Sequence, residues 1–536
     1  MVGEIATRRD DVEALSCGEA LIDLLEQYGV STVFGIPGVH TLEAYRGLTH
    51  SSIRHVLCRH EQGAGFAADG WGRMSRAPGV CLVISGPGVT NVLTPVGQAY
   101  HDSKPLLVIS GAVSAESHGH GPIHDLPDQR ALTAELTAFS HRVEDPQELP
   151  GVLARAFEVF ECGRPRPVHI AVPVDVLSQV TSRLVRIESE RTRPQADGAA
   201  VSEAADLLAH ARTPVILLGG GAVDAGPDAL RVAERIGAAV GLTINGKGAI
   251  PSSHPLCLGA ALSFRPVSDL IRSADVVVAV GTEFSELDWW GLDGPLALQG
   301  RLIRVDIDAG QLDTPHPADV ALHGDSAQVL AALADRLTDA GSGDASAAAA
   351  RVAEALEATQ WPTDLSDHRP LLDVLEHALP ADRIVTADST QPAYAANHML
   401  PVECPRSWMM PVGYGTLGCA LPMAIGAKLA APDRPVACLV GDGGILFTLQ
   451  ELATARDLGL ALPVIVWNND GYGEISDSML RDGIEPIGTD AGAHDLVAIA
   501  RGFGCEAATT RSMDEAASLI TTALGRDRPT LIEVRP

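Results

Sequence analysis

Basic residues are scarce in this sequence of 536 residues. It has 39 Lys and Arg against 68 Asp and Glu, which gives a formal net charge of -29. A protein that binds nucleic acid needs clustered Lys and Arg to neutralise phosphates, so the deficit argues against a nucleic-acid partner. An acidic surface favours solubility and attracts cationic small molecules, but it does not locate a site.

Paired cysteines and long hydrophobic runs are also absent. The nine cysteines are scattered, and no two of them form a C-x-x-C pair. An odd number of scattered cysteines in a long chain is typical of buried thiols in a reducing compartment. The first 16 residues lack the apolar centre of a secretory signal, and no apolar run is long enough to span a membrane. We therefore expect a cytoplasmic protein with no membrane partner.

Short apolar runs are what the sequence has in abundance. Hydrophobic residues make up 46% of the chain and charged residues 20%, an ordinary globular composition. The runs alternate with helical patterns, such as that of residues 17–29. This alternation predicts doubly wound parallel sheets with right-handed crossovers, and thus an α/β fold. We expect strands within residues 31–38, 79–88, 105–113, 167–176, 213–222, 238–246, 274–283, 301–308, 382–390, 435–443, 462–470 and 528–536.

Two segments of different composition divide these runs into three groups of four. Residues 186–200 are charged and contain proline, and residues 339–358 are rich in Ala, Gly and Asp. The first segment is typical of a linker, and the second marks another shift of composition. We predict three domains, at residues 10–185, 199–338 and 370–536.

Polar residues follow two neighbouring apolar runs of the third domain. Asp442 comes just after one run, and Asn468 and Asn469 come just after the next. Ligands of open parallel sheets bind beyond the carboxyl ends of the strands, where a carboxylate and an amide oxygen suit Mg²⁺ bound together with phosphate. Gly-Asp-Gly alone is equally compatible with a turn before a helix. Three glycines here would let backbone N–H groups approach a phosphate: Gly441, Gly443 and Gly444.

The stretch GDGGILFTLQELATARDLGLALPVIVWNNDGYGE (441–474) resembles the diphosphate- and metal-binding motif of thiamine diphosphate (ThDP) enzymes. The whole chain resembles the acetolactate synthase and pyruvate decarboxylase superfamily. Its domains would then be a pyrimidine-binding, a central and a diphosphate-binding domain. The resemblance implies three metal ligands, namely Asp442, the Asn469 side chain and the Gly471 carbonyl. Tyr472 and Gly473 would lie beside the cofactor.

A second motif, RHEQGAGFAADGWGR (59–73), matches the family around its catalytic glutamate. The resemblance implies that Glu61 hydrogen-bonds the aminopyrimidine ring of ThDP and promotes removal of the C2 proton. Taken alone, a carboxylate near a helix start is usually a favourable contact with the helix dipole. SGPGVTN (85–91) and QAYHDSKPL (98–106) also match, and we interpret them as scaffold at the edge of the active site.

Residues 413–430, GYGTLGCALPMAIGAKLA, contain a G-x-G-x-x-G match. A dinucleotide site would need a strand leading into it, and none is evident. The segment resembles the family loop that bends the cofactor, in which Gly415 would supply a carbonyl and Leu417 an apolar wedge. Helix packing by small residues is the alternative. Another strand-end loop, ADSTQ, would supply hydrogen-bond donors to the diphosphate from Ser389, Thr390 and Gln391.

The flavin signatures of acetolactate synthases are missing from the central domain. The corresponding segments read LGAALSFRP (258–266) and VGTEFSELDWWG (280–291). We therefore expect no FAD, which lowers the odds of acetolactate synthesis.

Three further strings resemble 5-guanidino-2-oxopentanoate (2-ketoarginine) decarboxylases. They lie at residues 34–48, at residues 124–141, and from residue 468 to residue 490. Planar carboxylates are the natural partners of a guanidinium group, and Trp faces stack on it. An acidic loop is more often ordinary solvated surface. The candidate substrate contacts are Asp125, Asp128, Glu474, Asp477 and Asp288, the last beside Trp289 and Trp290.

One more loop matches the segment that approaches the thiazolium ring in the family. It contains Val39 and His40, and His40 is a candidate proton relay that is also compatible with an inert role.

The predicted function is ThDP- and Mg²⁺-dependent decarboxylation of a 2-oxo acid, with 2-ketoarginine as the best candidate. A carboligase of the acetolactate synthase type is the main alternative, because both fates share every step through decarboxylation. A non-catalytic scaffold is disfavoured, since Glu61, Asp442 and Asn469 are all present. The resemblance further implies a homodimer as the smallest active unit and a homotetramer as the expected assembly.

Overall fold

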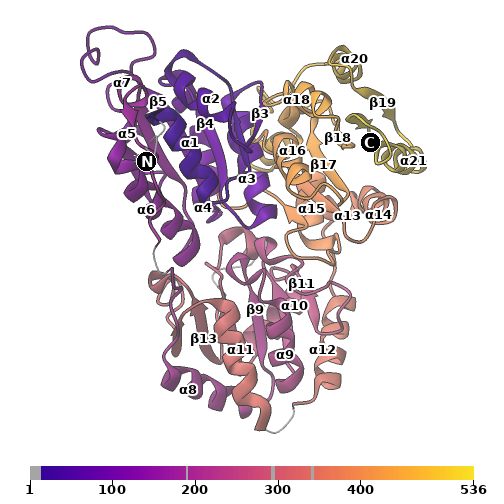
Figure 1. The fold of residues 1–536 in the computed structure, drawn as a ribbon. Coiled ribbons are helices and arrows are strands. Elements are labelled where there is room, and N and C mark those ends of the chain that lie inside the picture. Colours follow the sequence, from indigo (N-terminus) through magenta and orange to yellow (C-terminus); the bar gives the residue numbers. More distant parts are fainter. Residues whose placement is uncertain (1–13, 189–190, 291–295, 340–342) are drawn as a thin grey trace, which may run out of the picture.

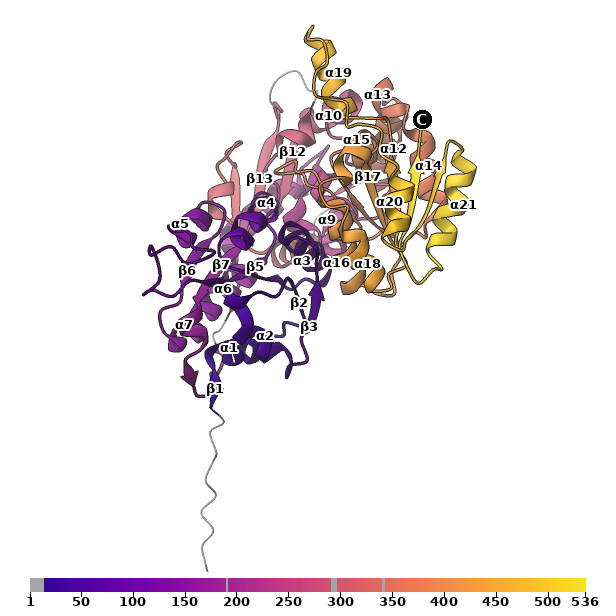
Figure 2. The same cartoon turned by 90° about the horizontal axis from the view of Figure 1, so that it is seen from above.

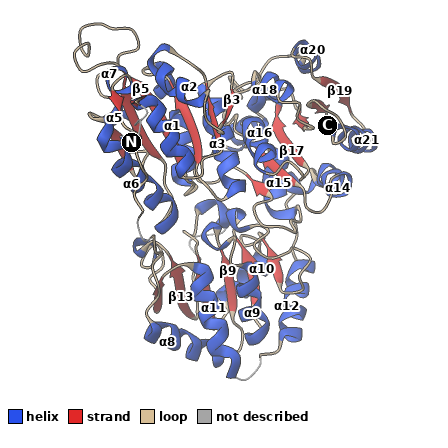
Figure 3. Ribbon diagram, in the orientation of Figure 1, coloured by secondary structure: helices blue, strands red, loops and turns tan. Residues whose placement is uncertain are grey.

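The computed structural model describes residues 14–188, 191–290, 296–339 and 343–536. Three six-stranded parallel sheets, each covered by helices, make up the molecule (Figures 1 and 3). In Figure 1 the N-terminal part lies beside the C-terminal part, and the central part lies below both. The view from above shows the same N- and C-terminal neighbours (Figure 2). The prediction of three doubly wound α/β sheets is confirmed.

The N-terminal sheet has the order β3-β2-β4-β5-β7-β6, with every neighbouring pair parallel. A short antiparallel pair, β1 (Leu15–Ser16) with β8 (Val180–Thr181), ties the two ends of this domain together. The strands of the sheet, from one edge to the other, are β3 (Arg54–Leu57), β2 (Thr32–Gly35), β4 (Gly79–Val83), β5 (Leu106–Ala112), β7 (Val168–Pro173) and β6 (Phe139–Arg142).

The other two sheets repeat this arrangement with parallel pairing throughout. The central sheet runs β11 (Cys257–Gly259), β10 (Ala239–Leu242), β9 (Val215–Leu218), β12 (Val276–Val280), β13 (Arg301–Asp306), β14 (Val320–His323). The C-terminal sheet runs β16 (Trp408–Met409), β15 (Ile384–Ala387), β17 (Val436–Gly441), β18 (Pro463–Trp467), β20 (Thr530–Val534), β19 (Glu506–Thr510).

The twelve predicted strands are the four inner strands of each sheet, and the six edge strands were not predicted. Inner strands such as β5 and β18 are buried along their whole length, because helices cover both faces of the sheet. Their sequences are therefore continuous apolar runs. Edge strands such as β3 and β14 are short and partly exposed, so they lack this signal. One of them, β16, precedes the 413–430 segment, where no strand was expected.

The N- and C-terminal domains meet where α3 (Glu61–Ser75) crosses α16 (Ala420–Ala430). Glycines let the two backbones approach closely. A Cβ on Gly426 would lie 1.9 Å from the carbonyl oxygen of Ala67, and one on Gly70 would lie 2.6 Å from Cα of Met423. Side chains larger than hydrogen would therefore force these helices apart.

The segment after the central sheet contains a helix that packs back on that sheet. Helix α12 (Ala345–Glu357) contacts α9 (Gly226–Ile236), α10 (Arg265–Arg272) and two strands of the central domain. The exact domain limits, 10–185, 199–338 and 370–536, stay a prediction. Within the described residues, no helix combines the length and apolarity needed to cross a membrane.

Candidate active site

Three oxygen atoms gather at the carboxyl ends of β17 and β18, which are paired neighbours. Asp442 begins α17 (Asp442–Ile445), and Asn469 and Gly471 lie in the loop after β18. Oδ1 of Asn469 lies 3.2 Å from Oδ1 of Asp442 and 3.0 Å from the carbonyl oxygen of Gly471. Ligand oxygens at right angles around Mg²⁺ are about 3 Å apart, since each lies at about 2.1 Å from the ion. The spacing therefore suits a small divalent cation.

The orientation of the Asn469 amide supports this interpretation. Its NH₂ group donates to Oε1 of Gln391 over 3.1 Å, and Gln391 in turn donates to Asp477 over 3.0 Å. Turning the amide over would hydrogen-bond Asp442 and Gly471, but it would place two amide oxygens 3.1 Å apart at Gln391. A cation among the three oxygens would satisfy every group in the present orientation.

The glycines around these oxygens leave no room for side chains. A Cβ on Gly443 would lie 2.6 Å from the ring of Tyr472, and one on Gly473 would lie 2.3 Å from the amide nitrogen of Asn469. Gly441 lies against Thr390, whose Oγ1 would be 3.0 Å from an added Cβ. Three loops thus converge here. In contrast to Asn469, Asn468 is buried and donates to Glu533, which gives it a structural role.

The glycine loop of residues 413–418 is fixed at both ends by buried carboxylates. Asp388, in the ADSTQ loop, accepts from the backbone N–H of Gly418 over 2.7 Å. Burial raises the pKa of Asp388 to about 6. Asp102 accepts from the backbone N–H of Gly413 over 2.8 Å. Gly415, between them, is exposed and has a φ of +65°, in the left-handed region that favours glycine.

Glu61 is the first residue of α3, and the side chain of His60 caps this helix. Oε2 of Glu61 accepts a hydrogen bond of 2.9 Å from Nδ2 of Asn91, which lies on α4 (Pro87–His101). The turn before Glu61 is held by a second domain. Glu451, on α18 (Glu451–Asp457), accepts from the backbone N–H groups of Arg59 and His60 over 2.9 and 3.1 Å. Glu61 therefore has a fixed position at the boundary between the two domains.

Models of one enzyme family match most of the chain. The thiamine pyrophosphate enzyme N-terminal TPP binding domain matches residues 15–132, the central domain residues 201–333, and the C-terminal TPP binding domain residues 388–534. The chain belongs to the thiamine pyrophosphate enzyme family. The resemblance to ThDP enzymes that the sequence showed is therefore confirmed. ThDP, also called thiamine pyrophosphate, is the cofactor that enzymes of this family bind.

Curated thiamine pyrophosphate enzymes match the chain along nearly its whole length. The probable 2-ketoarginine decarboxylase AruI of Pseudomonas aeruginosa is 48% identical over 532 residues, 98% of this chain and 94% of the relative. Acetolactate synthase isozyme 1 large subunit of Escherichia coli is 31% identical, covering 96% of this chain and 93% of the relative. A probable acetolactate synthase large subunit of Methanocaldococcus jannaschii is also 31% identical, with 96% and 91% covered.

Val39 and His40 form a short 3-10 turn, Val39–Thr41, in the N-terminal domain of this thiamine pyrophosphate enzyme. Val39 is 66% exposed, whereas His40 is buried and its Nδ1 has no hydrogen-bond partner within the described residues. Burial and the neighbouring His124, whose ring centroid is 5.3 Å away, lower the pKa of His40. The neutral form of the His40 ring is thus favoured, and its role as a proton relay stays a prediction.

Two of the acidic substrate candidates already have partners in their own loop. Asp125 accepts from the Gly119 N–H over 2.9 Å and contacts the His118 ring over 2.8 Å; these groups lower the pKa of its carboxyl. Asp128 caps α5 (Gln129–Ala134) by accepting from the N–H of Ala131. Their role in substrate binding stays a prediction. Both carboxylates also stabilise the local structure through these contacts.

The other acidic candidates lie in different places. Glu474 and Asp477 are on α19 (Gly473–Arg481), which begins directly after the Asn469 loop. Glu474 pairs with Arg481 over 3.2 Å and keeps 42% of its side chain exposed. These two carboxylates therefore lie at the rim of the oxygen cluster formed by Asp442, Asn469 and Gly471.

Asp288 lies in the central domain, away from these loops. It lines a cleft of about 550 Å³ between the three domains, whose wall also includes Arg73, Asp102, Asn245 and Gly413. Its carboxylate is buried and accepts from the N–H of Ile244 over 2.8 Å. Burial raises the pKa of Asp288 to about 7. Trp289 is partly buried and Trp290 is exposed.

Several residues that shape the site were not singled out from the sequence. Asn91 and Asp102 were covered only as scaffold, and Asp388 and Glu451 lie within the quoted motifs but were given no role of their own. Each contacts a partner from another segment of the chain, and no local sequence pattern predicts such a contact. The described residues also contain no group of three His, Cys, Asp or Glu side chains suited to a metal. The oxygen cluster is not such a group, because it combines one carboxylate with an amide oxygen and a backbone carbonyl oxygen.

Proposed function

We propose that the protein is a ThDP- and Mg²⁺-dependent decarboxylase that converts 5-guanidino-2-oxopentanoate to 4-guanidinobutanal and CO₂. The three oxygens of Asp442, Asn469 and Gly471 carry the proposal, because their spacing fits a cation that binds a diphosphate. The substrate follows from the relative of 48% identity that is named a probable 2-ketoarginine decarboxylase.

Residues of the C-terminal domain would hold the cofactor. Asp442, Asn469 and Gly471 would bind Mg²⁺. Glycine N–H groups at 441, 443 and 444 and the loop of Ser389, Thr390 and Gln391 would face the diphosphate. Gly415 would accept from the aminopyrimidine through its carbonyl, and Leu417 would support the bent form of ThDP. When bound, ThDP supplies the electron sink that makes loss of CO₂ from a 2-oxo acid feasible.

Glu61 would exchange a proton with the aminopyrimidine ring. The N–H of Asn91 fixes one carboxylate oxygen and leaves the other for the cofactor. Proton exchange by a positioned side chain typically contributes about 10² to 10⁴ in rate. Glu61→Gln should lower turnover by a factor in this range, with the unfolding temperature unchanged. The exposed Glu135→Gln serves as the control. Near-normal turnover in Glu61→Gln would remove Glu61 from the mechanism.

Glu474 and Asp477 are the carboxylates best placed for the guanidinium group. Both lie on the helix that follows the metal-type loop, and Asp477 is linked to Asn469 through Gln391. A substrate whose keto group reaches the cofactor would extend its tail past this rim. Charge-assisted hydrogen bonds from guanidinium to carboxylate are strong and directional, so they would favour this substrate over pyruvate.

The assembly is proposed to be a homodimer at least. Asn91 binds Glu61, and Asp102 binds Gly413. Asn91 lies on α4 and Asp102 directly follows this helix, so the two residues are 11 positions, or about 16 Å, apart along the helix axis. This separation of the two anchors favours an arrangement in which Glu61 and Gly415 serve different cofactors. Exposed apolar side chains on and after α19 offer a surface for a second copy: Ile475, Leu480, Ile484 and Ile487.

The deciding experiment is NMR of products after incubation with ThDP, Mg²⁺ and either 2-ketoarginine or pyruvate. Guanidinobutanal from 2-ketoarginine, with little reaction of pyruvate, is the expected outcome. No product from 2-ketoarginine would refute the substrate. The purified protein should also lack the visible absorption of a flavin.

A carboligase is the second candidate, favoured by the acetolactate synthases among the relatives. Acetolactate formed from pyruvate in the same experiment would establish it and displace the decarboxylase.

A further inference from the structure

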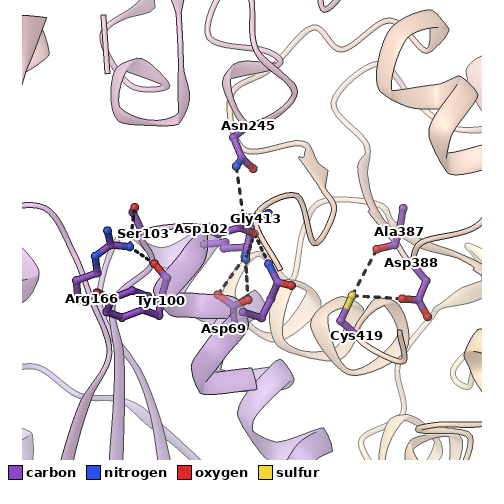
Figure 4. A network of polar contacts seen from close by, with 12 residues as sticks. Asp69, Tyr100, Asp102, Ser103, Arg166, Asn245, Ala387, Asp388, Gly413 and Cys419 are labelled. Carbon is purple, nitrogen blue, oxygen red and sulfur yellow. Dashed lines mark hydrogen bonds and ion pairs between the residues drawn. The ribbon is translucent and has the colours of Figure 1, made fainter. Parts of the chain in front are cut away.

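A single buried carboxylate joins all three domains beside the glycine loop. Asp102 follows the last residue of α4, and its side chain is fully buried. Oδ1 accepts from the N–H of Gly413 over 2.8 Å and from Nδ2 of Asn245 over 3.4 Å. Gly413 belongs to the C-terminal domain and Asn245 to the central domain. Figure 4 shows Asn245 and Gly413 approaching Asp102 from two directions.

The second oxygen of Asp102 is held by its own domain. Oδ2 accepts from Nη2 of Arg73 and from Nε2 of Gln98, both over 2.8 Å. Arg73 also pairs with the buried Asp69, so its charge has two carboxylate partners. A carboxylate offers about four acceptor positions, and here four donors occupy them. Asp102 therefore has little freedom to move, and its hydrogen bond restricts the backbone of Gly413 as well.

The loop next to Gly413 packs tightly on the same end of α4. A Cβ on Gly413 would lie 2.9 Å from Cβ of His101. The ring of Tyr414 stacks on the ring of His101, with centroids 4.9 Å apart and planes 9° apart. Beyond this contact the loop is exposed at Gly415 and partly exposed at Leu417, until Asp388 holds Gly418. Between the two carboxylates, the N–H of Gly415 also donates to the carbonyl oxygen of Pro411 over 3.1 Å.

We propose that Asp102 is a positioning residue that fixes the cofactor loop, residues 413–418, in its binding conformation. Without this anchor, several loop residues would be ordered only when ThDP binds, and that loss of conformational entropy would weaken binding. The inference rests on the proposed role of Gly415 and Leu417 in holding ThDP. It does not depend on which 2-oxo acid is the substrate.

The alternative is that Asp102 only neutralises Arg73 in the interior. Asp69 provides a matched comparison, because it pairs with the same Arg73 but has no hydrogen bond to the loop in the described residues. Both Asp102→Asn and Asp69→Asn remove one negative charge from the Arg73 pair. Only Asp102→Asn weakens the group that holds Gly413, because an amide offers one acceptor oxygen where the carboxylate offers two, and its NH₂ must face donors in either orientation.

The experiment is calorimetric titration of the full-length apoprotein with ThDP in excess Mg²⁺, together with hydrogen exchange of the peptide containing residues 413–418. Asp102→Asn should raise the dissociation constant of ThDP by ~10-fold or more, and loop exchange should become faster. Asp69→Asn should leave both quantities near the wild-type values, even if it lowers the unfolding temperature.

Equal weakening of ThDP binding in the two variants would overturn the proposal, and so would no weakening in Asp102→Asn. Should Asp102→Asn fail to fold, Asn245→Asp tests the same link from the central domain by placing a second carboxylate against Oδ1. It should weaken ThDP binding in the same direction, and an unchanged dissociation constant would again overturn the proposal. Because the readout is ThDP binding and not turnover, failure of the proposed substrate would leave it interpretable.

Discussion

Asn91 donates a hydrogen bond of 2.9 Å to Oε2 of Glu61, and within the described residues this is the one hydrogen bond to the Glu61 side chain. The two residues come from different helices, α3 and α4, and from sequence motifs 30 positions apart. The carboxylate of Glu61 thus has a defined rotamer before any cofactor binds. Positioning of this kind reduces the reorganisation needed during proton transfer.

Asn91→Leu should lower turnover by ~10-fold, because it removes the donor and leaves a side chain of similar size. Binding of ThDP should change less than turnover does. Steady-state kinetics at saturating ThDP provides the measurement. Thr90→Ala, at the exposed neighbouring position, is the control. Turnover equal to wild type in Asn91→Leu would mean that Glu61 is held by other means.

Asp442→Ala should abolish retention of Mg²⁺ and ThDP, since it removes the one carboxylate of the oxygen cluster. Calorimetry with ThDP, with and without Mg²⁺, measures the effect. Asp470→Asn is a matched control, because Asp470 lies in the same region but pairs with Arg535. Unchanged ThDP binding in Asp442→Ala would be incompatible with the metal site.

Glu474→Gln and Asp477→Asn should each raise KM for 2-ketoarginine by ~10-fold, because each loses a charged hydrogen-bond acceptor. An uncharged 2-oxo acid of similar length should show little change. Asp125→Asn and Asp128→Asn are the comparison, since both carboxylates have partners in their own loop. Should these two raise KM instead, the guanidinium contact would move to the N-terminal domain.

Asp288→Asn should change the pH dependence of stability and leave KM for the substrate unaltered. Asp288 has its pKa raised from 3.8 to about 7 in the folded protein. Between these values the folded state holds a proton that the unfolded state has released, so the free energy of unfolding falls as pH rises. The contribution is at most about 4 kcal/mol. Urea unfolding of both proteins below and above this window should show a smaller decrease in the variant, and an identical decrease would contradict the raised pKa.

The inner strands could be predicted because burial on both faces demands an apolar residue at nearly every position. β5, Leu106–Ala112, is buried throughout, and its sequence shows it. β6, Phe139–Arg142, is only partly buried and reads FSHR, a sequence without an apolar run. Edge strands such as this one are defined by the neighbour with which they pair, and that information is not local.

The same distinction applies to the site. The motif around Asp442 and Asn469 is local, and the sequence alone predicted that they would meet. The contacts of Asp102 with Gly413 and of Glu451 with the turn before Glu61 span 311 and about 390 positions. A lone aspartate or glutamate in a helical pattern gives no sign of such a partner. Positioning residues therefore emerge only from the three-dimensional arrangement.

The glycine contacts between α3 and α16 also limit how the enzyme can move. With Gly426 against the Ala67 carbonyl and Gly70 against Met423, a slide of either helix by one residue would bring side chains into backbone atoms. These contacts thus oppose sliding between the N- and C-terminal domains of one chain. A substrate would then reach the site past the segments exposed beside it, Gly415 and α19, rather than through a shift of these two helices.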